Sequence, residues 1–434
     1  CGPVGGHARQ RGRYRRPGDL LHAHLPDHGG HSRLQTPRSI SAKGRMKKIS
    51  RRQFTKAASL VAGGIAFPNV AFSAKPKVVV VGGGAGGATA AKYIAKDSVG
   101  AIDVTLIEAS KRYYTCFYSN LYLGGFRNYG SIGHNYYGLA VNHGVNVVHD
   151  WAASVDAQNK RVKLASGTSI SYDRLILSPG IDFKYDSVPG YSVETQSKMP
   201  HAWKSGTQTQ LLKRQVLNMK KGGNFVMVPP TNPFRCPPGP YERVSMIAHL
   251  LKEHNPKAKI IILDPKPKFS KQGLFMDGWE RHYSGMIEWI DPETHGGIKA
   301  VDANKMEFLT DLDTFKADAA CVIPAQKAGA IAMAAGINDG DWCPINPNNM
   351  ASKADPNIYV LGDASTAKSM PKSGFSANSQ AKVAANAVRG ELISSRVFPA
   401  RYSNTCWSLI ATNDGIKVGA SYKAGDQKID VVSK

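Results

Sequence analysis

Runs of apolar residues alternate along the chain with glycine-rich or proline-rich turns and with helical patterns. The stretch that begins at Lys77, KVVVVGGGAGGATAAKYIAK, has the pattern of a buried strand, a tight turn and a helix. A second strand pattern, DVTLIE, begins at Asp103. The succession returns at Asn224, where NFVMV precedes a loop and a helical pattern over about residues 242–252, and at Asn357, where NIYVLGDAS precedes a long helix. This order predicts an α/β fold with doubly wound parallel sheets.

Four residues of the first unit fit a dinucleotide site. Gly82, Gly84 and Gly87 form a GxGxxG fingerprint directly after the strand, and Glu108 follows 21 residues past Gly87, at the end of the next strand. The glycines permit a tight turn and close approach of the backbone to a pyrophosphate, and the acid accepts the ribose hydroxyls. We therefore predict that these residues bind a dinucleotide.

Two later segments indicate FAD rather than NAD. YDRLILSPGI, from Tyr172, resembles the connection that returns the chain across the FAD domain of two-domain flavoprotein reductases. The strand that begins at Asn357 ends in Gly362 and Asp363, where those reductases have an aspartate that hydrogen-bonds the ribityl or pyrophosphate region. The dipole of the following helix would stabilise the negative charge of a reduced flavin. The alternative role for Asp363 is to cap a turn.

The turn after the Asn224 strand argues against a second nucleotide site. In NFVMVPPTNPFRCPPGPYE, prolines occupy the loop where glycines would be expected. Proline has no N–H group to offer a phosphate, and its ring blocks close backbone approach. Asp264, at the end of KIIILD, still stands where a ribose-binding acid would. The pattern predicts an NAD-like domain without a functional nucleotide site, and a loop whose prolines restrict the backbone around Cys236.

Composition limits the class of protein. With 434 residues, of which 42% are hydrophobic, the chain has room for two or three domains and a large core. No run of eighteen strongly apolar residues predicts a membrane span, and basic runs with interleaved aromatics, typical of nucleic-acid binding, are missing. Residues 1–74 hold 14 Lys and Arg against 2 Asp and Glu, so their removal lowers the formal net charge from +24 to +12. A surface of this sign favours anionic partners or substrates.

The first 74 residues read as two non-catalytic segments. Residues 1–45 lack periodicity and any apolar core, which predicts a non-native or disordered leader. Residues 46–74 join a basic head, which contains SRRQFTK, to a mild Ala/Gly-rich stretch that ends in small residues. This is the pattern of a twin-arginine signal peptide, cleaved near Ser73 or Ala74, and it predicts a periplasmic protein. A basic solvated tail is the alternative.

The remaining chain holds five cysteines: Cys116, Cys236, Cys321, Cys343 and Cys406. An oxidising compartment permits disulfides, but an odd number leaves at least one cysteine with another role. Cys321 lies in the strand-like run AACVI and is predicted to be a core residue.

Short motifs around these cysteines carry a family resemblance. They are YYTC at 113–116, HAWK at 201–204, FRCPPGPYER at 234–243, MPKSGFSANSQ at 370–380 and NTC at 404–406. With them the chain resembles, over residues 75 to about 420, the flavoprotein subunit of flavocytochrome c sulfide dehydrogenase. The resemblance implies the FAD/NAD(P)-binding two-domain, glutathione-reductase-like fold, with sulfide:quinone oxidoreductases as relatives.

The resemblance implies a redox-active disulfide between Cys236 and Cys406, beside the flavin ring. Hydrosulfide would open this bridge and leave a persulfide on one sulfur, and two electrons would pass to FAD. Cys343 is the rival partner for Cys236, and an ordinary structural disulfide is the alternative to a redox-active one. The resemblance also places Glu242 near the flavin, where it would move protons or tune the thiolate, unless it only compensates the helix dipole.

The resemblance assigns two more residues to the cofactor. Cys116 would form a thioether to the 8α-methyl group of FAD, which would retain the cofactor after export. A free buried cysteine that packs as a small apolar residue is the alternative. Lys372, in the MPKSG motif, joins the predicted cofactor-binding residues.

Electrons from sulfide need an acceptor outside the chain, because the sequence has no CxxCH motif for haem attachment. The resemblance implies a c-type cytochrome subunit, and thus a sulfide-cytochrome-c reductase. One alternative is a membrane-associated sulfide:quinone oxidoreductase, which should carry a C-terminal amphipathic helix that residues 415–434 do not suggest. The other is a non-catalytic electron-transfer flavoprotein.

The predicted domain organisation has an interruption. Residues 75–190 and 330–395 form the FAD-binding domain, residues 191–329 the NAD-like domain, and residues 396–434 a C-terminal segment that carries Cys406. Within this segment DGIKVGASYKAG, from Asp414, alternates like a small hairpin. The resembled family usually continues beyond the point at which this sequence stops.

Overall fold

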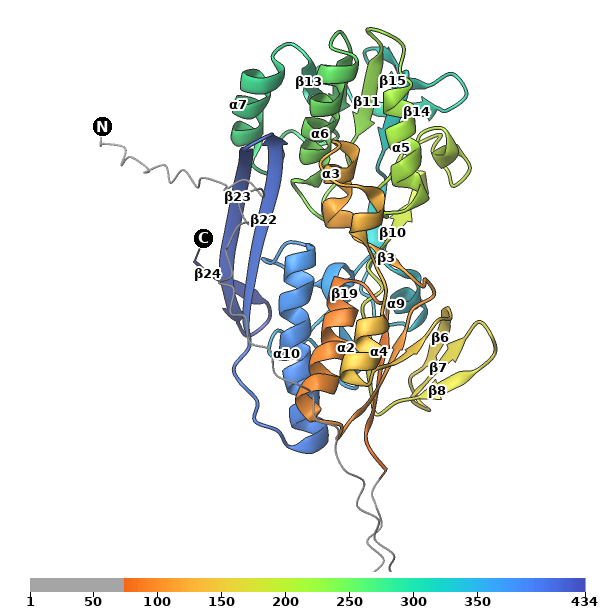
Figure 1. Ribbon diagram of the computed structural model, residues 1–434, viewed down its shortest axis with the longest axis vertical. Coiled ribbons are helices and arrows are strands. Elements are labelled where there is room, and N and C mark those ends of the chain that lie inside the picture. The colour runs from red at the N-terminus through yellow and green to blue at the C-terminus, as the bar shows by residue number, and fades with distance from the viewer. Residues whose placement is uncertain (1–73, 434) are drawn as a thin grey trace, which may run out of the picture. The chain divides into compact units, whose positions relative to one another are not determined.

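The computed structural model describes residues 74–433 (Figure 1). The predicted leader, residues 1–45, and the predicted signal peptide up to residue 73 lie outside this part. Among the described residues, no helix is long and apolar enough to cross a membrane.

A five-stranded parallel sheet carries the glycine fingerprint. Its strand order is β20-β9-β1-β2-β5, and the change of direction beside β1 is typical of a doubly wound dinucleotide-binding sheet. Helix α2 (Ala85–Ser98) follows β1 and packs against α10 (Gly374–Ile393), as Figure 1 shows. The strands are β1 (Lys77–Val81), β2 (Asp103–Ile107), β5 (Asn146–Val148), β9 (Arg174–Leu177) and β20 (Ile358–Val360).

A second parallel sheet has the order β13-β12-β11-β17. Its strands are β11 (Asn224–Val228), β12 (Lys259–Leu263), β13 (Ile287–Ile290) and β17 (Ala319–Val322), and its helices are α5 (Thr207–Leu217), α6 (Gly239–His254) and α7 (Gln272–Tyr283). Helix α6 starts three residues before the predicted position, because Pro240 in its first turn already has a helical φ. The predicted α/β fold with two parallel sheets is confirmed.

Short elements make up the rest of the fold between residues 113 and 366. The antiparallel ones are β3 (Tyr113–Tyr114) with β4 (Gly133–His134), β6 (Ala152–Asp156) with β7 (Arg161–Leu164) and β8 (Ser169–Ser171), β10 (Ile181–Lys184) with β18 (Ala325–Ala328), and β14 (Ile298–Asp302) with β15 (Glu307–Thr310) and β16 (Thr314–Lys316). Strands β19 (Cys343–Pro344) and β21 (Ser365–Thr366) pair in parallel. The short α-helices are α3 (Ser119–Leu123), α4 (Tyr137–His143), α8 (Pro292–His295) and α9 (Ala330–Ala334).

The C-terminal segment forms a three-stranded antiparallel sheet of β22 (Arg401–Ala411), β23 (Asp414–Ala424) and β24 (Ile429–Ser433). The predicted small hairpin within residues 414–425 is therefore wrong, since that stretch is the single strand β23. The hairpin turn lies just before it, where Asn413 has a φ of 64°, a conformation that asparagine tolerates. In Figure 1 this sheet runs alongside the helices of both parallel sheets, and β22 contacts α6, α7 and α10.

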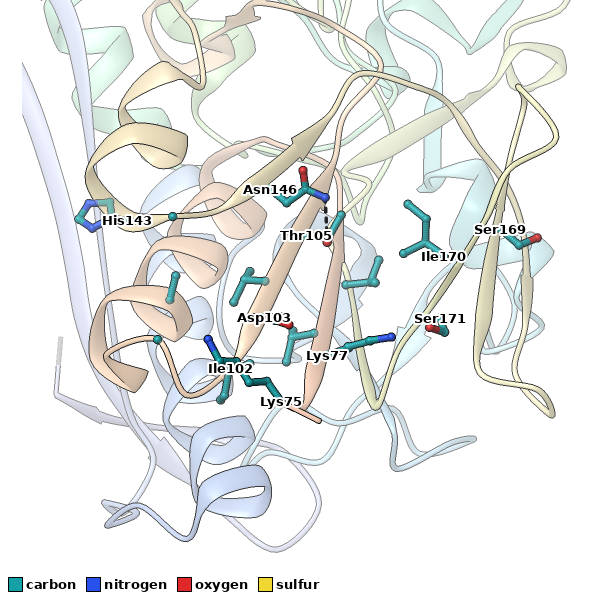
Figure 2. Close-up of a pocket in the computed structure, with 16 residues that line it drawn as sticks. Lys75, Lys77, Ile102, Asp103, Thr105, His143, Asn146, Ser169, Ile170 and Ser171 are labelled. Carbon is teal, nitrogen blue, oxygen red and sulfur yellow. Dashed lines mark hydrogen bonds between the residues drawn. The ribbon is translucent and has the colours of Figure 1, made fainter. Parts of the chain in front are cut away.

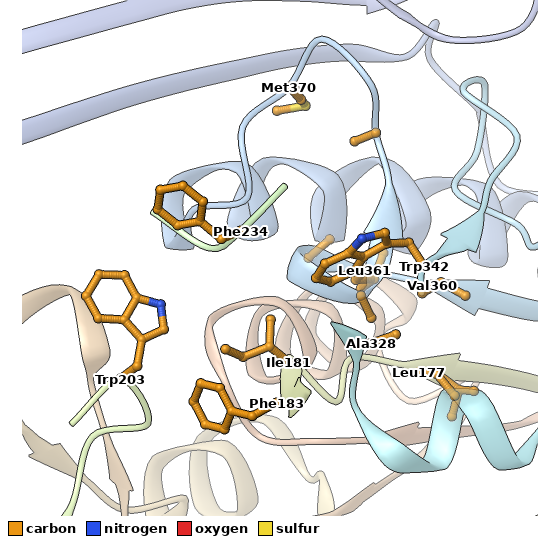
Figure 3. Close-up of a cluster of buried hydrophobic side chains, with 14 of the residues drawn as sticks. Leu177, Ile181, Phe183, Trp203, Phe234, Ala328, Trp342, Val360, Leu361 and Met370 are labelled. Atoms are coloured by element: carbon orange, nitrogen blue, oxygen red, sulfur yellow. The ribbon is translucent and has the colours of Figure 1, made fainter. Parts of the chain in front are cut away.

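One large apolar core extends from the first parallel sheet to the second. In part of this core, Trp203 and Phe234 lie on the left and Trp342 on the right, with Met370 above and Phe183 below (Figure 3). Residues 75–434 accordingly form one compact unit. The division into domains at residues 190, 329 and 395 stays a prediction, but this shared core is where the site residues meet.

Gly87 gives a direct test of the glycine turn. A Cβ atom at Gly87 would lie 1.9 Å from the carbonyl oxygen of Gly82, which is backbone and has no room to move. We expect Gly87→Ala to lower the free energy of unfolding by roughly 1–3 kcal/mol, measured by urea denaturation. Gly130→Ala is the matched control, because a Cβ atom there meets nothing within 4 Å. Equal stabilities of the two variants would contradict this reading of the turn.

Candidate active site

The glycines of the fingerprint differ in how closely the rest of the protein approaches them. Gly82 has a φ of 95°, and a Cβ atom on it would lie 2.3 Å from the carbonyl oxygen of Ser178. A Cβ atom on Gly84 would meet only the ring of Tyr113, at 3.7 Å, so packing within the protein does not require glycine there. Glu108 accepts a hydrogen bond from the backbone N–H of Gly83 at 2.7 Å, which fixes the acid beside the turn. Gly82, Gly84 and Glu108 therefore lie together at the turn after β1, as they do in a dinucleotide site.

Asp363 offers an unpaired oxygen to the same region. It follows β20 in a short 3₁₀ turn, after Gly362, whose backbone N–H donates to Gln380 at 2.8 Å. Its Oδ2 atom lies 3.8 Å from Nη1 of Arg235, whereas Oδ1 is buried and has no hydrogen-bond partner. Burial raises the pKa of this carboxyl, and the charges of Arg235 and Lys372 oppose that rise. A buried acceptor without a partner is costly, so a ligand donor here would stabilise the site.

Lys372 connects Asp363 to the cysteine loop. Its ammonium group donates to the carbonyl oxygens of Asp363 and Ser365 at 2.7 and 2.8 Å, and lies 3.6 Å from the ring centre of Trp342. Its own carbonyl oxygen accepts the backbone N–H of Cys236 at 2.7 Å. Burial lowers the pKa of Lys372 to about 8.

The residues present fit a bound FAD. Besides Asp363 Oδ1, the buried atoms without a hydrogen-bond partner include Trp203 Nε1 and Gln326 Nε2. All three belong to residues that contact Arg235, since its guanidinium also donates to the carbonyl oxygen of Trp203 and its backbone N–H donates to Gln326. Apolar side chains of the first parallel sheet and of the segments beside it gather in this region (Figure 3). Polar atoms without partners inside an apolar lining are typical of a ligand site.

Cys116 lies at the start of a 3₁₀ turn (Cys116–Tyr118) between β3 and α3. Burial is the largest cause that raises the pKa of Tyr113, and the charge of the Cys116 sulfur is the next. The same charge raises the pKa of Arg235, so the Cys116 sulfur lies near both side chains. The next residue, Phe117, packs against Gly374 at the start of α10, where a Cβ atom would lie 2.8 Å from its ring. The Cys116 sulfur therefore lies beside the residues that fit FAD, and its covalent bond to the cofactor stays a prediction.

Cys236 has an unusual backbone. Its φ is 57°, in the left-handed region that few non-glycine residues occupy. Its carbonyl oxygen accepts the N–H of Gly239 at 2.7 Å, and a Cβ atom on Gly239 would lie 2.9 Å from the Cys236 sulfur. Burial raises the pKa of the Cys236 thiol, and the charges of Cys406 and Glu242 act in the same direction. Such over-determined strain is concentrated at functional sites.

Cys406 reaches this site from β22. Asn404, two residues earlier, has Nδ2 3.4 Å from the Cys406 sulfur, and its Oδ1 accepts the hydroxyl of Ser373, the N-cap of α10, at 2.6 Å. The carbonyl oxygen of Lys372 accepts the backbone N–H of Cys236, and the next residue, Ser373, donates to Asn404, so the segments that carry the two cysteines meet at the start of α10. After burial, the charge of Cys406 is the largest cause that raises the pKa of Cys236, which agrees with one shared site. Both are free thiols in the structure, and their disulfide stays a prediction. Cys343, the rival partner, is a buried residue of β19 and has no such influence on Cys236.

Glu242 joins the cysteine loop to the C-terminal sheet. Its two carboxylate oxygens accept hydrogen bonds from Asn120 Nδ2 at 2.8 Å and from the backbone N–H of Leu409 at 2.9 Å. It is 9% exposed, and burial raises its pKa against these two hydrogen bonds. These contacts put Glu242 inside the site, although it also stands in the first turn of α6.

Three residues of this site were missed in the sequence: Asn120, Arg235 and Lys271. Arg235 precedes Cys236 directly, and that position was the one available signal. Asn120 lies more than a hundred residues from Cys236 in the sequence, and Lys271 lies more than thirty residues from it. Only folding brings these two residues to the thiols.

At the second sheet, the acid is occupied and the cavity beside the strand ends is small. Asp264 is fully buried, and four donors occupy its carboxylate: the backbone N–H and Nζ of Lys266, the hydroxyl of Tyr241 and Nε1 of Trp289. The cavity beside the carboxyl ends of β11 and β12, lined by Pro189, Pro229 and Pro265 among others, measures about 130 Å³. Ligand pockets of drug-sized molecules usually exceed about 300 Å³.

A larger cavity, of about 570 Å³, lies away from the predicted site residues (Figure 2). Its lining includes Lys77 and Asp103, at the amino ends of β1 and β2. In open α/β sheets ligands bind outside the carboxyl ends of the strands, so this cavity is not the catalytic site. The described residues hold no cluster of His, Cys, Asp and Glu suited to a metal ion.

Two parallel nucleotide-binding-type sheets, one of them fitted to FAD and the other closed, define a disulfide-reductase-like flavoprotein. The family models are specific. The model of the sulfide dehydrogenase (flavocytochrome c) flavoprotein chain, central, matches residues 209–324, and that of flavocytochrome c sulphide dehydrogenase, flavin-binding, matches residues 399–434. The pyridine nucleotide-disulphide oxidoreductase model matches residues 76–221. The chain therefore matches the models of flavocytochrome c sulfide dehydrogenase flavoproteins over its central and C-terminal parts, where the cysteine motifs predicted this resemblance.

The chain is also similar to other flavoprotein-type oxidoreductases, one in sequence and others in fold. Mitochondrial sulfide:quinone oxidoreductase of Mus musculus is 28% identical over 202 residues, 43% of this chain and 41% of that protein. The match thus spans less than half of the relative's length. The sulfide:quinone oxidoreductase structure of Aquifex aeolicus has a TM-score of 0.60 at 16% identity, covering 83% of this chain and 87% of the other. An NAD-dependent persulfide reductase of A. fulgidus has a TM-score of 0.60 at 15% identity, covering 82% and 71%.

Proposed function

We propose that this chain is the flavoprotein subunit of a periplasmic sulfide dehydrogenase, which oxidises hydrosulfide and passes the electrons to a c-type cytochrome subunit. The observation that carries the proposal is the convergence of Cys236 and Cys406 on one site beside residues that fit FAD. The matches to the two flavocytochrome c sulfide dehydrogenase models support the substrate and the partner. Export rests on the twin-arginine motif at Arg51 and Arg52, outside the described residues.

The reaction starts from a disulfide between Cys236 and Cys406. Hydrosulfide attacks one sulfur, a new S–S bond forms while the Cys236–Cys406 bond breaks, and the other cysteine leaves as a thiolate. The step moves one negative charge from hydrosulfide to the thiolate and needs no oxidant. Bound FAD supplies the two-electron acceptor for the sulfur oxidation.

The surrounding residues divide the remaining tasks. Asp363 and Lys372 would hold the cofactor, and Cys116 would tether it. Glu242 takes the proton of the new persulfide, because burial raises its pKa and its hydrogen bonds to Asn120 and Leu409 orient both oxygens.

The closed second sheet favours sulfide over a nicotinamide as electron donor. Prolines fill the turn after β11, and Asp264 has no free acceptor capacity toward a ribose. The same features argue against a reductase driven by NADH.

An anaerobic titration of the exported protein tests the proposal. We expect sulfide to bleach the flavin absorbance and NADH to leave it unchanged, and the reduced protein to pass electrons to cytochrome c. Turnover with a quinone but not with cytochrome c would instead support a sulfide:quinone oxidoreductase, to which the mouse and Aquifex relatives point. A flavin that sulfide does not bleach would leave a non-catalytic electron-transfer flavoprotein, and reduction by NADH alone would overturn the proposal.

A further inference from the structure

Lys271 is a half-buried cation at the thiol site that neither the motifs nor the proposed function uses. It immediately precedes α7, and its ammonium group donates to the carbonyl oxygen of Cys406 at 3.1 Å and to the hydroxyl of Ser408 at 3.3 Å. An ammonium group has three N–H donors, so one remains available for another acceptor.

The surroundings of Lys271 are mostly acidic. Burial lowers its pKa, and the charges of Cys406, Cys236 and Glu242, in that order, act against the lowering. Titratable groups from four elements face the two sulfurs. They are Glu242 of α6, Arg235 of the cysteine loop, Tyr422 of β23 and Cys116 of the 3₁₀ turn. Arg235 is engaged by Asp363 and by the carbonyl oxygen of Trp203. Lys271 is thus the cation on the Cys406 side of the site.

The fold holds Lys271 at this place with several contacts. Its φ is 63°, a left-handed conformation that a lysine seldom adopts. Helix α7, which follows, is fastened to the C-terminal hairpin, since the Tyr283 hydroxyl donates to the carbonyl oxygen of Ile410 at 2.7 Å and Arg281 pairs with Asp414 at 2.6 Å. The position of the ammonium group relative to Cys406 is therefore fixed from both sides.

We propose that Lys271 is the anion-binding residue of this site, where it stabilises hydrosulfide as it arrives at Cys406 and Cys236 and then the thiolate that its attack releases. The proposal rests on the proposed function for the substrate, and on contacts within the chain for the thiolate. One negative charge persists through the attack, because one S–S bond forms as another breaks and no proton moves. A single fixed cation can stabilise that charge before and after the step.

Alkylation of the reduced protein tests the thiolate part without any sulfide. The rate at which iodoacetamide modifies Cys406 is followed by peptide mass analysis across a pH series, in the wild type and in Lys271→Met, Lys271→Gln and Lys271→Arg. Loss of a neighbouring cation disfavours the thiolate, so the rate at pH 7 should fall about tenfold in the Met and Gln variants. The pH of half-maximal rate should rise by about one unit, and Arg should preserve both.

Lys268→Met is the matched control, because Lys268 is an exposed lysine of the same loop. A rate of Cys406 alkylation equal to that of the wild type in both Lys271→Met and Lys271→Gln would overturn the proposal. A fall in this rate that Lys271→Arg shows as well would also overturn it. If Lys271→Met does not fold, as judged by its flavin content, Lys271→Gln gives the decision.

Anaerobic stopped-flow reduction by sulfide tests the substrate part. The second-order rate constant should fall at least about tenfold in Lys271→Met, with a smaller effect on the limiting rate at saturating sulfide. An unchanged rate constant would remove the substrate role. A wild type that sulfide does not reduce would overturn the proposed function, while the alkylation series would still decide the role of Lys271 toward the thiolate.

Discussion

Replacing Cys406 by alanine will abolish the reduction of the bound flavin by sulfide and leave the flavin content unchanged. The sulfur of Cys406 shares one site with that of Cys236, and the proposed attack needs both atoms in one disulfide. Loss of a residue that forms the reacting bond typically costs a factor of about 10³ or more in rate. Anaerobic bleaching of the flavin after mixing with sulfide measures the effect, and Cys236→Ala should behave in the same way.

Cys343→Ala separates this reading from the rival pairing of Cys236 with Cys343. Cys343 is buried in β19, and the pKa of its thiol is raised to about 11 by burial, as expected for an inert core cysteine. We expect this variant to be reduced by sulfide at the wild-type rate. If instead Cys343→Ala abolishes bleaching while Cys406→Ala retains it, the pairing proposed here is wrong.

Replacing Cys116 by serine will release the flavin from denatured protein. The Cys116 sulfur lies beside Tyr113 and Arg235, within the site that fits FAD, and a thioether would survive denaturation whereas hydrogen bonds would not. Acid-precipitated wild-type protein should therefore stay yellow, and the supernatant of Cys116→Ser should carry the colour. Absorbance of the two fractions, after anaerobic handling, measures the difference.

The control for this experiment is again Cys343→Ala, which should keep the flavin in the precipitate. A wild-type precipitate that loses its flavin would show that no covalent bond exists. Cys116 would then be an ordinary half-buried cysteine of the 3₁₀ turn.

The parts of the fold that sequence predicted are those fixed by local chemistry. Gly82 and Gly87 must be glycine because a Cβ atom would overlap neighbouring backbone, and β1 is apolar from Val78 to Val81 because these residues are buried between other strands. The proline-rich turn after β11 likewise follows from residue types alone. The small hairpin predicted from Asp414 was wrong, since alternation along β23 describes one exposed face and cannot identify its partner strands.

The amino-acid sequence by itself determined the two parallel sheets, the glycine turn and the proline turn that argues against a second nucleotide, because each depends on the conformations and hydrogen-bonding groups of neighbouring residues. Only the tertiary structure decided that Cys406 meets Cys236, that Asn120 and Leu409 hold Glu242, and that Lys271 lies beside the sulfurs. The physical reason is that these contacts join segments far apart in the chain, and packing of β22 against α6, α7 and α10 sets their distances.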